Sequence, residues 1–254
     1  MILALCGTRE GREIVKRLSL ENIPIIATVT TEYGAKLIDE SIEVIKDKLD
    51  EEKMKILIKE RNIDTILDIT HPYAENISKL ALKVTNAENI KYIRYERQDS
   101  GYSSKDNSLI LWADDFYEAA QMAKKFEGNI FLTIGSNQIP IFLKEIEVNR
   151  LIARVLPLGK IVKLNEERGF TPDNLIAMKG PFNKEINIQM FKTYGASVIV
   201  AKDSGKTGGT EEKIEAAMEL GIPIILVKKP KLDYENIYSD MNLLIKDIIS
   251  KTYN

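Results

Sequence analysis

The chain has 254 residues, of which 44% are hydrophobic and 29% are charged, and its formal net charge is −2. This balance is typical of a globular protein, and it excludes the global basic field that attracts nucleic acid or an acidic membrane. No apolar run approaches the roughly 18 residues of a membrane span, and the apolar start lacks the basic segment of a signal peptide. The chain has one cysteine and one histidine, which excludes an internal disulfide and argues against a transition-metal site. We therefore expect a cytoplasmic monomer or homodimer without metal, nucleic acid or membrane partners.

Apolar strands alternate with amphipathic helices in the first half of the chain. The pattern predicts strands at residues 2–5, 25–29, 41–45, 65–69 and 91–94, and helices at residues 9–20, 51–61 and 75–85. Strands that are apolar throughout indicate a parallel sheet with helices on both faces. Residues 96–107 are polar and show neither period, so they are expected to link two domains.

The same alternation restarts in the second half of the chain, without an exact internal repeat. The pattern predicts strands at residues 109–112, 130–134, 151–155, 175–178, 197–201 and 222–227, and helices at residues 115–126, 183–194, 211–220 and 237–252. The sequence thus predicts an α/β protein of two Rossmann-like domains, residues 1–106 and 107–254, with mainly parallel sheets and a ligand cleft between them. Ligands of such sheets bind beyond the carboxyl ends of the strands.

A glycine-rich loop follows the predicted strand at residues 197–201. It has three glycines within residues 205–209, and Thr210 is expected to cap the next helix. A strand, a glycine loop and a helix direct backbone N–H groups at an anion, and Lys202 and Lys213 add cations on either side. It is not a P-loop, because that motif needs a glycine where Val200 stands. The alternative is an ordinary strand–helix connection with surface lysines.

The loop after the first predicted strand matches only part of the dinucleotide fingerprint, since glycine is present only at Gly7 and Gly11. Thr8 and the amides after it are nonetheless suited to a pyrophosphate, and Arg9 to a bidentate contact with a phosphate. Alternatively, Arg9 is simply a solvated residue of the first helical turn. After the second predicted strand, Thr30, Thr31 and Glu32 leave the choice between NADH and NADPH open.

Several polar residues stand at or near the predicted strand ends. His71 precedes a proline that rigidifies its turn, and both a structural hydrogen-bonding role and a ligand contact remain open. Asp68 and Asp203 are suited either to ribose binding or to loop capping. If several of the basic residues there converge, the ligand carries several negative charges; otherwise they are surface residues. These basic residues are Arg94, Arg97, Arg154, Lys179, Lys202 and Lys213.

Together these motifs form a specific set. It comprises Gly7-Thr8, Asp68-Ile69-Thr70-His71-Pro72-Tyr73-Ala74, Arg94-Tyr95-Glu96-Arg97, Phe131-Leu132-Thr133-Ile134-Gly135, Gly180-Pro181-Phe182, Lys202-Asp203-Ser204-Gly205 with Gly208-Gly209, Glu212-Lys213 and Ala216-Ala217. In this order the set resembles the precorrin-6A reductase family of cobalamin biosynthesis, including its cobalt-precorrin form. Two residues depart from the family pattern: Cys6 stands in place of a glycine, and Gln98 in place of a proline.

The resemblance implies hydride transfer from NADPH or NADH to a double bond of a tetrapyrrole rich in carboxylates. It implies that His71 and Lys202 are catalytic candidates. The implied cofactor-binding residues are Gly7, Thr8, Arg9, Glu10, Thr30, Thr31, Thr70, Ser204 and Gly205. The implied substrate-binding residues are Tyr73, Arg94, Arg97, Arg154, Asp203 and Lys213. The alternatives are a nucleotide-sugar transferase, which would show no redox chemistry, and a non-catalytic ligand-binding protein of two lobes.

Overall fold

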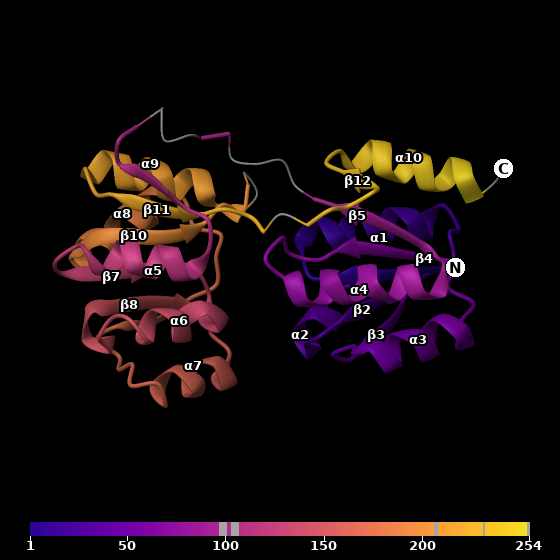
Figure 1. Cartoon of the computed structure of the whole chain (residues 1–254), viewed down its shortest axis with the longest axis horizontal. Helices are drawn as coiled ribbons and strands as arrows, with labels where there is room; N and C mark the ends of the chain where they lie inside the picture. The colour runs from indigo at the N-terminus through magenta and orange to yellow at the C-terminus, as the bar shows by residue number, and fades with distance from the viewer. Residues whose placement is uncertain (97–100, 103–106, 206–207, 231, 253–254) are drawn as a thin grey trace. The chain divides into compact units, whose positions relative to one another are not determined.

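The protein is described by a computed structural model that covers residues 1–96, 101–102, 107–205, 208–230 and 232–252 (Figure 1). It divides into two compact units, residues 1–97 with 231–254 and residues 98–230. Each unit contains one six-stranded sheet, and all the strand pairs described in both sheets are parallel. The predicted α/β class with parallel sheets is confirmed, whereas the cleft between the domains stays a prediction.

The first unit has the strand order of a dinucleotide-binding Rossmann sheet, β12-β5-β4-β1-β2-β3. Its strands are β1 (Ile2–Cys6), β2 (Ile25–Val29), β3 (Glu43–Lys46), β4 (Thr65–Ile69), β5 (Lys91–Tyr95) and β12 (Ile237–Tyr238). Its helices are α1 (Arg9–Leu20), α2 (Glu32–Ala35), α3 (Glu51–Glu60), α4 (Glu75–Glu88) and α10 (Met241–Thr252). The strand order reverses between β1 and β4, which is where such sheets bind ligands.

The C-terminal segment belongs to the first unit, in contrast to the predicted boundary of the second domain at residues 107–254. The predicted helix over residues 237–252 is also wrong at its start, because β12 precedes α10. β12 pairs with β5, where Ile237 lies opposite Arg94. Helix α10 buries Leu244 and Ile248 in the core that contains Leu18 of α1. Burial of this apolar face, which no local pattern assigns to one domain or the other, explains the placement.

The second unit has the strand order β6-β11-β10-β7-β8-β9, which reverses between β10 and β7. Its strands are β6 (Ile110–Ala113), β7 (Asn129–Leu132), β8 (Leu151–Val155), β9 (Leu175–Ala177), β10 (Ala196–Lys202) and β11 (Ile224–Val227). Its helices are α5 (Phe116–Lys124), α6 (Ile139–Leu143), α7 (Gly159–Glu166), α8 (Lys184–Thr193) and α9 (Thr210–Leu220), with 3₁₀ turns η1 (Ser136–Gln138) and η2 (Val148–Arg150). The sequence did not predict α2, α6 and α7, because helices this short show no clear period.

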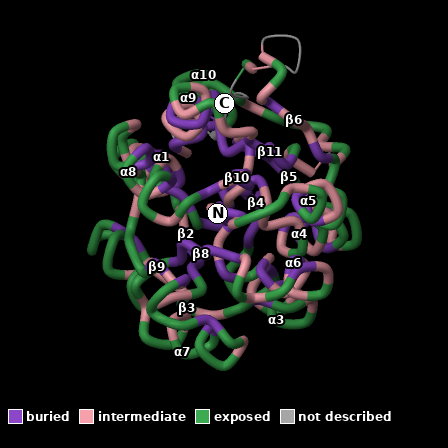
Figure 2. Tube along the Cα trace, turned by 90° about the vertical axis from the view of Figure 1, so that its left-hand side faces the viewer, coloured by how far each residue is buried: buried purple, intermediate pink, exposed green. Residues whose placement is uncertain are grey.

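The cores of the two units are built from strands that are buried on both faces. β1, β4 and β8 are buried at every position. Figure 2 shows β4 and β8 as buried and much of the surrounding helices as exposed. This is the burial that β-branched apolar runs predict for parallel strands. In the described part of the chain, no helix is long and apolar enough to cross a membrane.

Candidate functional site

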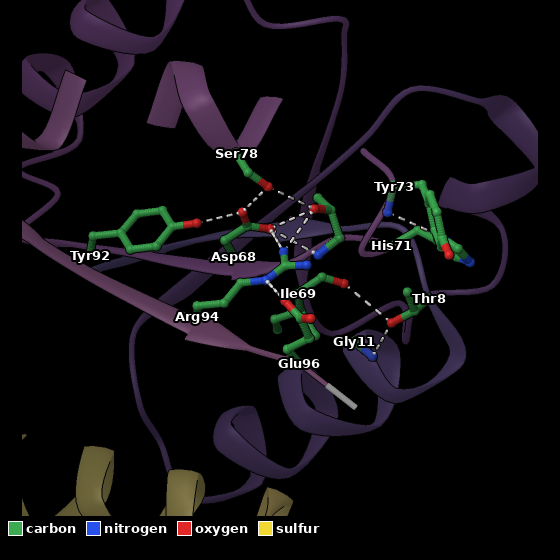
Figure 3. Close-up of polar contacts among 11 residues, drawn as sticks. Thr8, Gly11, Asp68, Ile69, His71, Tyr73, Ser78, Tyr92, Arg94 and Glu96 are labelled. Atoms are coloured by element: carbon green, nitrogen blue, oxygen red, sulfur yellow. Dashed lines mark hydrogen bonds and ion pairs between the residues drawn. The ribbon is translucent and has the colours of Figure 1, made fainter. Parts of the chain in front are cut away.

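The loop from β1 to α1 lies close to β4, the strand that neighbours β1 in the sheet. Thr8 caps α1: its hydroxyl accepts a hydrogen bond from Gly11 N at 3.0 Å and donates one to Ile69 O at 3.2 Å (Figure 3). A Cβ on Gly11 would lie 3.2 Å from Ile69 Cγ2, a contact that Ile69 could accept only by shifting a few tenths of an ångström. Gly11 thus takes the role of the last glycine of the dinucleotide fingerprint, which allows close helix–strand packing. Gly7 is exposed at the same edge.

The residues that flank Thr8 differ in exposure. Arg9 is exposed and Glu10 is half-buried, both in the first turn of α1. Cys6, which stands in place of the family's glycine, is buried at the end of β1. Burial raises the pKa of its thiol to about 12, so it remains a neutral and unreactive thiol.

Asp68 is the centre of a fully buried polar network at the end of β4 (Figure 3). Its carboxylate accepts hydrogen bonds from the Tyr92 hydroxyl at 2.7 Å and the Ser78 hydroxyl at 2.5 Å. It also accepts bonds from the amide and the hydroxyl of Thr70, at 3.0 and 2.7 Å, and it pairs with Arg94 at 2.7 Å. The network therefore holds β4, β5 and α4 together and fixes the start of the His71 loop.

Arg94, which the sequence predicts to bind substrate, lies buried inside the first unit. Its side chain is 0% exposed, paired with Asp68 at 2.7 Å and with Glu96 at 3.4 Å. Its guanidinium lies 5.4 Å from the ring centre of Tyr234, a residue of the C-terminal segment. Arg94 is therefore the internal counter-charge of Asp68, and its Nη2 atom has no hydrogen-bond partner among the described residues. A contact between Arg94 and the substrate stays a prediction.

His71 and Tyr73 lie on the loop that follows β4, next to the β1 loop. Tyr73 N donates a hydrogen bond to His71 Nδ1 at 3.3 Å, and the two rings are 5.6 Å apart. A Cβ on Gly7 would lie 3.8 Å from both His71 N and Thr70 Cα. The predicted residues Gly7, Thr70 and His71 thus meet where the strand order reverses. Both aromatic side chains are half-buried and keep some exposure.

The residues after β2 line the same edge of the first sheet. Thr30 is exposed, and Thr31 caps α2 by accepting a hydrogen bond from Gly34 N at 3.0 Å. Glu32, the first acid after β2, forms an exposed ion pair with Lys46 of β3. The hydrogen bond from Lys46 lowers the pKa of Glu32, so this carboxylate is charged at neutral pH.

In the second unit, the loop between β10 and α9 is held by internal hydrogen bonds. The hydroxyl of Thr210 donates to Lys202 O at 3.1 Å and accepts from Ser204 N at 3.0 Å. Thr210 is therefore the first helical residue rather than the predicted cap, and Gly209, with φ +70°, precedes the helix. Asp203 caps the loop itself, since Gly205 N donates to its carboxylate at 3.3 Å. Asp203, Ser204 and Gly205 are all buried.

Three basic side chains, Arg154, Lys202 and Lys213, lie at this end of the second sheet. Arg154, near the end of β8, is buried; its guanidinium donates to Asn187 Oδ1 at 2.9 Å and lies 4.4 Å from the ring centre of Phe182. Burial lowers the pKa of Lys202 to about 8. Burial, together with the charges of Arg154 and Lys202, lowers the pKa of Lys213 to about 7. Arg154 and Lys202 are thus near enough to act on the charge of Lys213, and we call the three residues the cation cluster.

Two glycines lie near the lysine side chains of the cation cluster and show where the cluster lies. A Cβ on Gly135, after β7, would lie 4.0 Å from Lys202 Nζ. A Cβ on Gly209 would lie 3.6 Å from Lys213 Nζ and 3.7 Å from Glu212 Oε2. Lys213 Nζ donates to Gly209 O at 2.7 Å and to Gly208 O at 3.2 Å. The cluster therefore lies at the carboxyl ends of β7, β8 and β10.

The structure groups the predicted site residues into two sets, one in each unit. Arg154, Lys202, Asp203, Ser204, Gly205 and Lys213 lie in the second unit, and the remaining described ones lie in the first. Arg97 lies outside the described residues.

Sequence reasoning missed Asn187, which holds Arg154, and the Ser78 and Tyr92 partners of Asp68. Asn187 interrupts the buried face formed by Ile188 and Phe191, and such an interruption is the signal that could have identified it.

Comparison with known proteins shows similarity over almost the whole chain. The family model described as precorrin-6x reductase CbiJ/CobK matches residues 1–248. The chain belongs to this family. A relative from Methanocaldococcus jannaschii, named cobalt-precorrin-6A reductase, is 38% identical over 250 residues that cover 97% of each chain. Another from Priestia megaterium, with the same name, is 34% identical over 256 residues that cover 99% of each chain.

The fold agrees with a solved structure of similar length. The structure titled CobK precorrin-6A reductase has a TM-score of 0.79 and 18% identity to this chain, covering 98% of this chain and 96% of its own. The resemblance predicted from the motifs is therefore confirmed at the level of family and fold. The family is one of reductases in cobalamin biosynthesis, which is the class of enzyme that the motifs predict.

Proposed function

We propose that this protein reduces one double bond of cobalt-precorrin-6A, giving cobalt-precorrin-6B, with a hydride from NADH or NADPH. The observation that carries the proposal is the family match over residues 1–248. The relatives from M. jannaschii and P. megaterium, both named for the cobalt-containing substrate, support the cobalt form over the metal-free one. The protein acts in the cytoplasm as a monomer or homodimer.

The first unit fits a nicotinamide dinucleotide. Its strand order is that of dinucleotide-binding sheets, and Gly11 allows the close helix–strand packing that they require. In our proposal the first turn of α1 and the Arg9 side chain bind the pyrophosphate, with Gly7 leaving room for it. In the same proposal Thr30 and Glu32, which follow β2, contact the adenosine ribose of the cofactor. When bound, the cofactor supplies the hydride.

The second unit fits the tetrapyrrole. The cation cluster binds carboxylates, and Phe182 beside Arg154 offers an aromatic surface to the macrocycle. Leu156 and Met178, which follow β8 and β9, are 49% and 43% exposed and add apolar surface at the same edge of the sheet. A ligand that is apolar on its faces and anionic at its rim suits this combination of residues.

Reduction of a carbon–carbon double bond requires a proton as well as the hydride. We assign the proton to Lys202, whose pKa of about 8 leaves it protonated at neutral pH yet able to release a proton. His71 orients the nicotinamide from the first unit, because its loop is fixed by the Asp68 network beside Gly7. Catalysis then consists mainly of positioning the two reacting carbons in contact.

The test is oxidation of the reduced nicotinamide, followed by its near-ultraviolet absorbance, with NADH and NADPH in separate reactions. We expect oxidation that depends on cobalt-precorrin-6A, and the faster cofactor settles the specificity. A folded protein that oxidises neither cofactor in the presence of authentic substrate would contradict the proposal. Binding of a sugar nucleotide without redox chemistry would instead support a transferase.

A further inference from the structure

Two buried arginines, each the last but one residue of its strand, are held in opposite ways. Arg94 of β5 is 0% exposed and pairs with the Asp68 carboxylate at 2.7 Å. Arg154 of β8 is 8% exposed, and its guanidinium donates to Asn187 Oδ1 at 2.9 Å and to Met190 Sδ at 3.3 Å. Both acceptors are neutral, and no carboxylate among the described residues pairs with Arg154. A buried cation without a counter-charge destabilises the folded state, so folding alone does not account for this arrangement.

Asn187 is the residue that fixes Arg154. Its side chain is 0% exposed and lies on the buried face of α8. Its Oδ1 accepts from Arg154, while its Nδ2 donates to Asn183 O at 2.9 Å and to Phe182 O at 3.3 Å. Because both carbonyls need a donor, the amide can present only its oxygen to the guanidinium. Asn187 therefore holds the arginine and also the backbone of Phe182, whose ring centre lies 4.4 Å from Arg154 Cζ.

These contacts use one nitrogen of the guanidinium. Both hydrogen bonds of Arg154 come from Nη1, and in the part of the chain that the structure describes, Nη2 and Nε donate to no protein group. A guanidinium binds a carboxylate through two neighbouring nitrogens with parallel N–H bonds. Since Asn187 and Met190 occupy Nη1 and carry no charge, they set the direction of the guanidinium and leave its charge for a ligand.

We propose that Asn187 is a positioning residue for the reaction: it holds Arg154 by Nη1 through a neutral acceptor, so that the Nη2–Nε edge binds an acidic group of the substrate. A carboxylate beside Nη1 would hold Arg154 more firmly, as Asp68 holds Arg94, but it would compete with the substrate for the same charge. The inference rests on the proposed function, because the acidic group belongs to the tetrapyrrole. It adds to the cation cluster the residue that orients its permanently charged member.

Met190 is the position where a charge can be added while the hydrogen bonds of Asn187 stay intact. It is half-buried, and its sulfur already accepts from Arg154. Met190→Glu places a carboxylate beside Nη1, and Met190→Gln is the matched neutral control. We expect Met190→Glu to unfold at a higher urea concentration than Met190→Gln, yet to have a KM for cobalt-precorrin-6A at least tenfold higher. An arginine with a purely structural role would gain stability without a change in KM.

Asn187→Leu tests the positioning role itself, because it removes both hydrogen-bonding functions at similar side-chain volume. We expect its KM for cobalt-precorrin-6A to rise at least tenfold and its kcat to change less, since the reacting groups themselves are unaltered. A loss of folded protein alone would lower the apparent kcat and leave KM unchanged. Asn174→Leu is the control: this buried asparagine donates to Val148 O at 2.9 Å before the start of β9, so its loss should lower stability and leave KM unchanged.

The outcomes separate this inference from the proposed function. An active unmodified protein, together with equal KM values for Met190→Glu and Met190→Gln, overturns this inference and leaves the proposed function intact. An unchanged KM in folded Asn187→Leu overturns it as well. Absence of substrate-dependent cofactor oxidation by the folded, unmodified protein overturns both proposals. A KM that rises in Met190→Glu and Asn187→Leu, but in neither control, establishes the positioning role.

Discussion

The Asp68–Arg94 pair offers a matched test of how burial changes the strength of an ion pair. Its closest nitrogen–oxygen distance is 2.7 Å with both side chains 0% exposed. The Arg61–Glu43 pair in the same unit has the same 2.7 Å distance, but its side chains are 46% and 47% exposed. The two pairs thus differ chiefly in their contact with water.

Replacing Asp68 with asparagine keeps the shape of the side chain and removes its charge. Arg94 would then be a buried cation with only the more distant Glu96 as a counter-charge, and breaking a buried pair of this kind costs about 3–5 kcal/mol of the free energy of unfolding. The hydroxyls of Ser78 and Tyr92 would also lose a charged acceptor. Glu43→Gln removes one charge from a pair of equal length in water, so it should cost at most about 1 kcal/mol.

The assay is urea-induced unfolding followed by far-ultraviolet circular dichroism, with linear extrapolation to water. We expect a large loss of stability for Asp68→Asn and almost none for Glu43→Gln. If the two variants lie within about 1 kcal/mol of each other, the assignment of Asp68 and Arg94 as the structural centre of β4 and β5 is incorrect.

Three further predictions concern glycine packing, titration and catalysis. Gly11→Ala should destabilise the protein by about 1–3 kcal/mol, because its Cβ meets Ile69 at 3.2 Å. It should also weaken binding of NADH or NADPH, measured by fluorescence. Gly159→Ala is the control: it has open space around it and should change neither stability nor binding. The folded-state pKa of Lys213 is about 7 against 10.5 for an ordinary lysine, so the unfolded chain binds more protons between these values and stability rises with pH there. Lys213→Met should flatten this rise in urea melts at a series of pH values, and an unchanged slope would refute the burial of this amine. Lys202→Ala should lower turnover or ligand affinity at least tenfold, about 1.4 kcal/mol, and unchanged steady-state kinetics would remove Lys202 from the site.

Local patterns were sufficient to predict most of the fold. The helix at Arg9–Leu20 and the strands Ile25–Val29, Thr65–Ile69 and Leu151–Val155 have the predicted bounds. Each has a clear apolar period and a polar or glycine-containing boundary. The site loops were found for the same reason, because they interrupt this pattern at strand ends.

What the sequence did not reveal depends on contacts between distant residues. β12 is two residues long, and its place beside β5 depends on pairing across more than a hundred positions. The sequence alone does not show that Arg94 pairs with Asp68, because the two residues lie on different strands and meet only in the folded sheet. Likewise, Thr210 has the residue type of a helix cap, yet its hydroxyl is engaged by Lys202 and Ser204. Polar residues of this kind are assigned only once their partners are known.

The most direct test of the central claim is transfer of deuterium from reduced nicotinamide to the macrocycle. Cobalt-precorrin-6A would be incubated with the protein and with NADH or NADPH deuterated at the transferring carbon, and the product would be analysed by mass spectrometry. We predict a product that carries one deuterium from the cofactor and one hydrogen from solvent. A reduced product without deuterium, or a substrate that remains unreduced in the presence of both cofactors, would contradict the account.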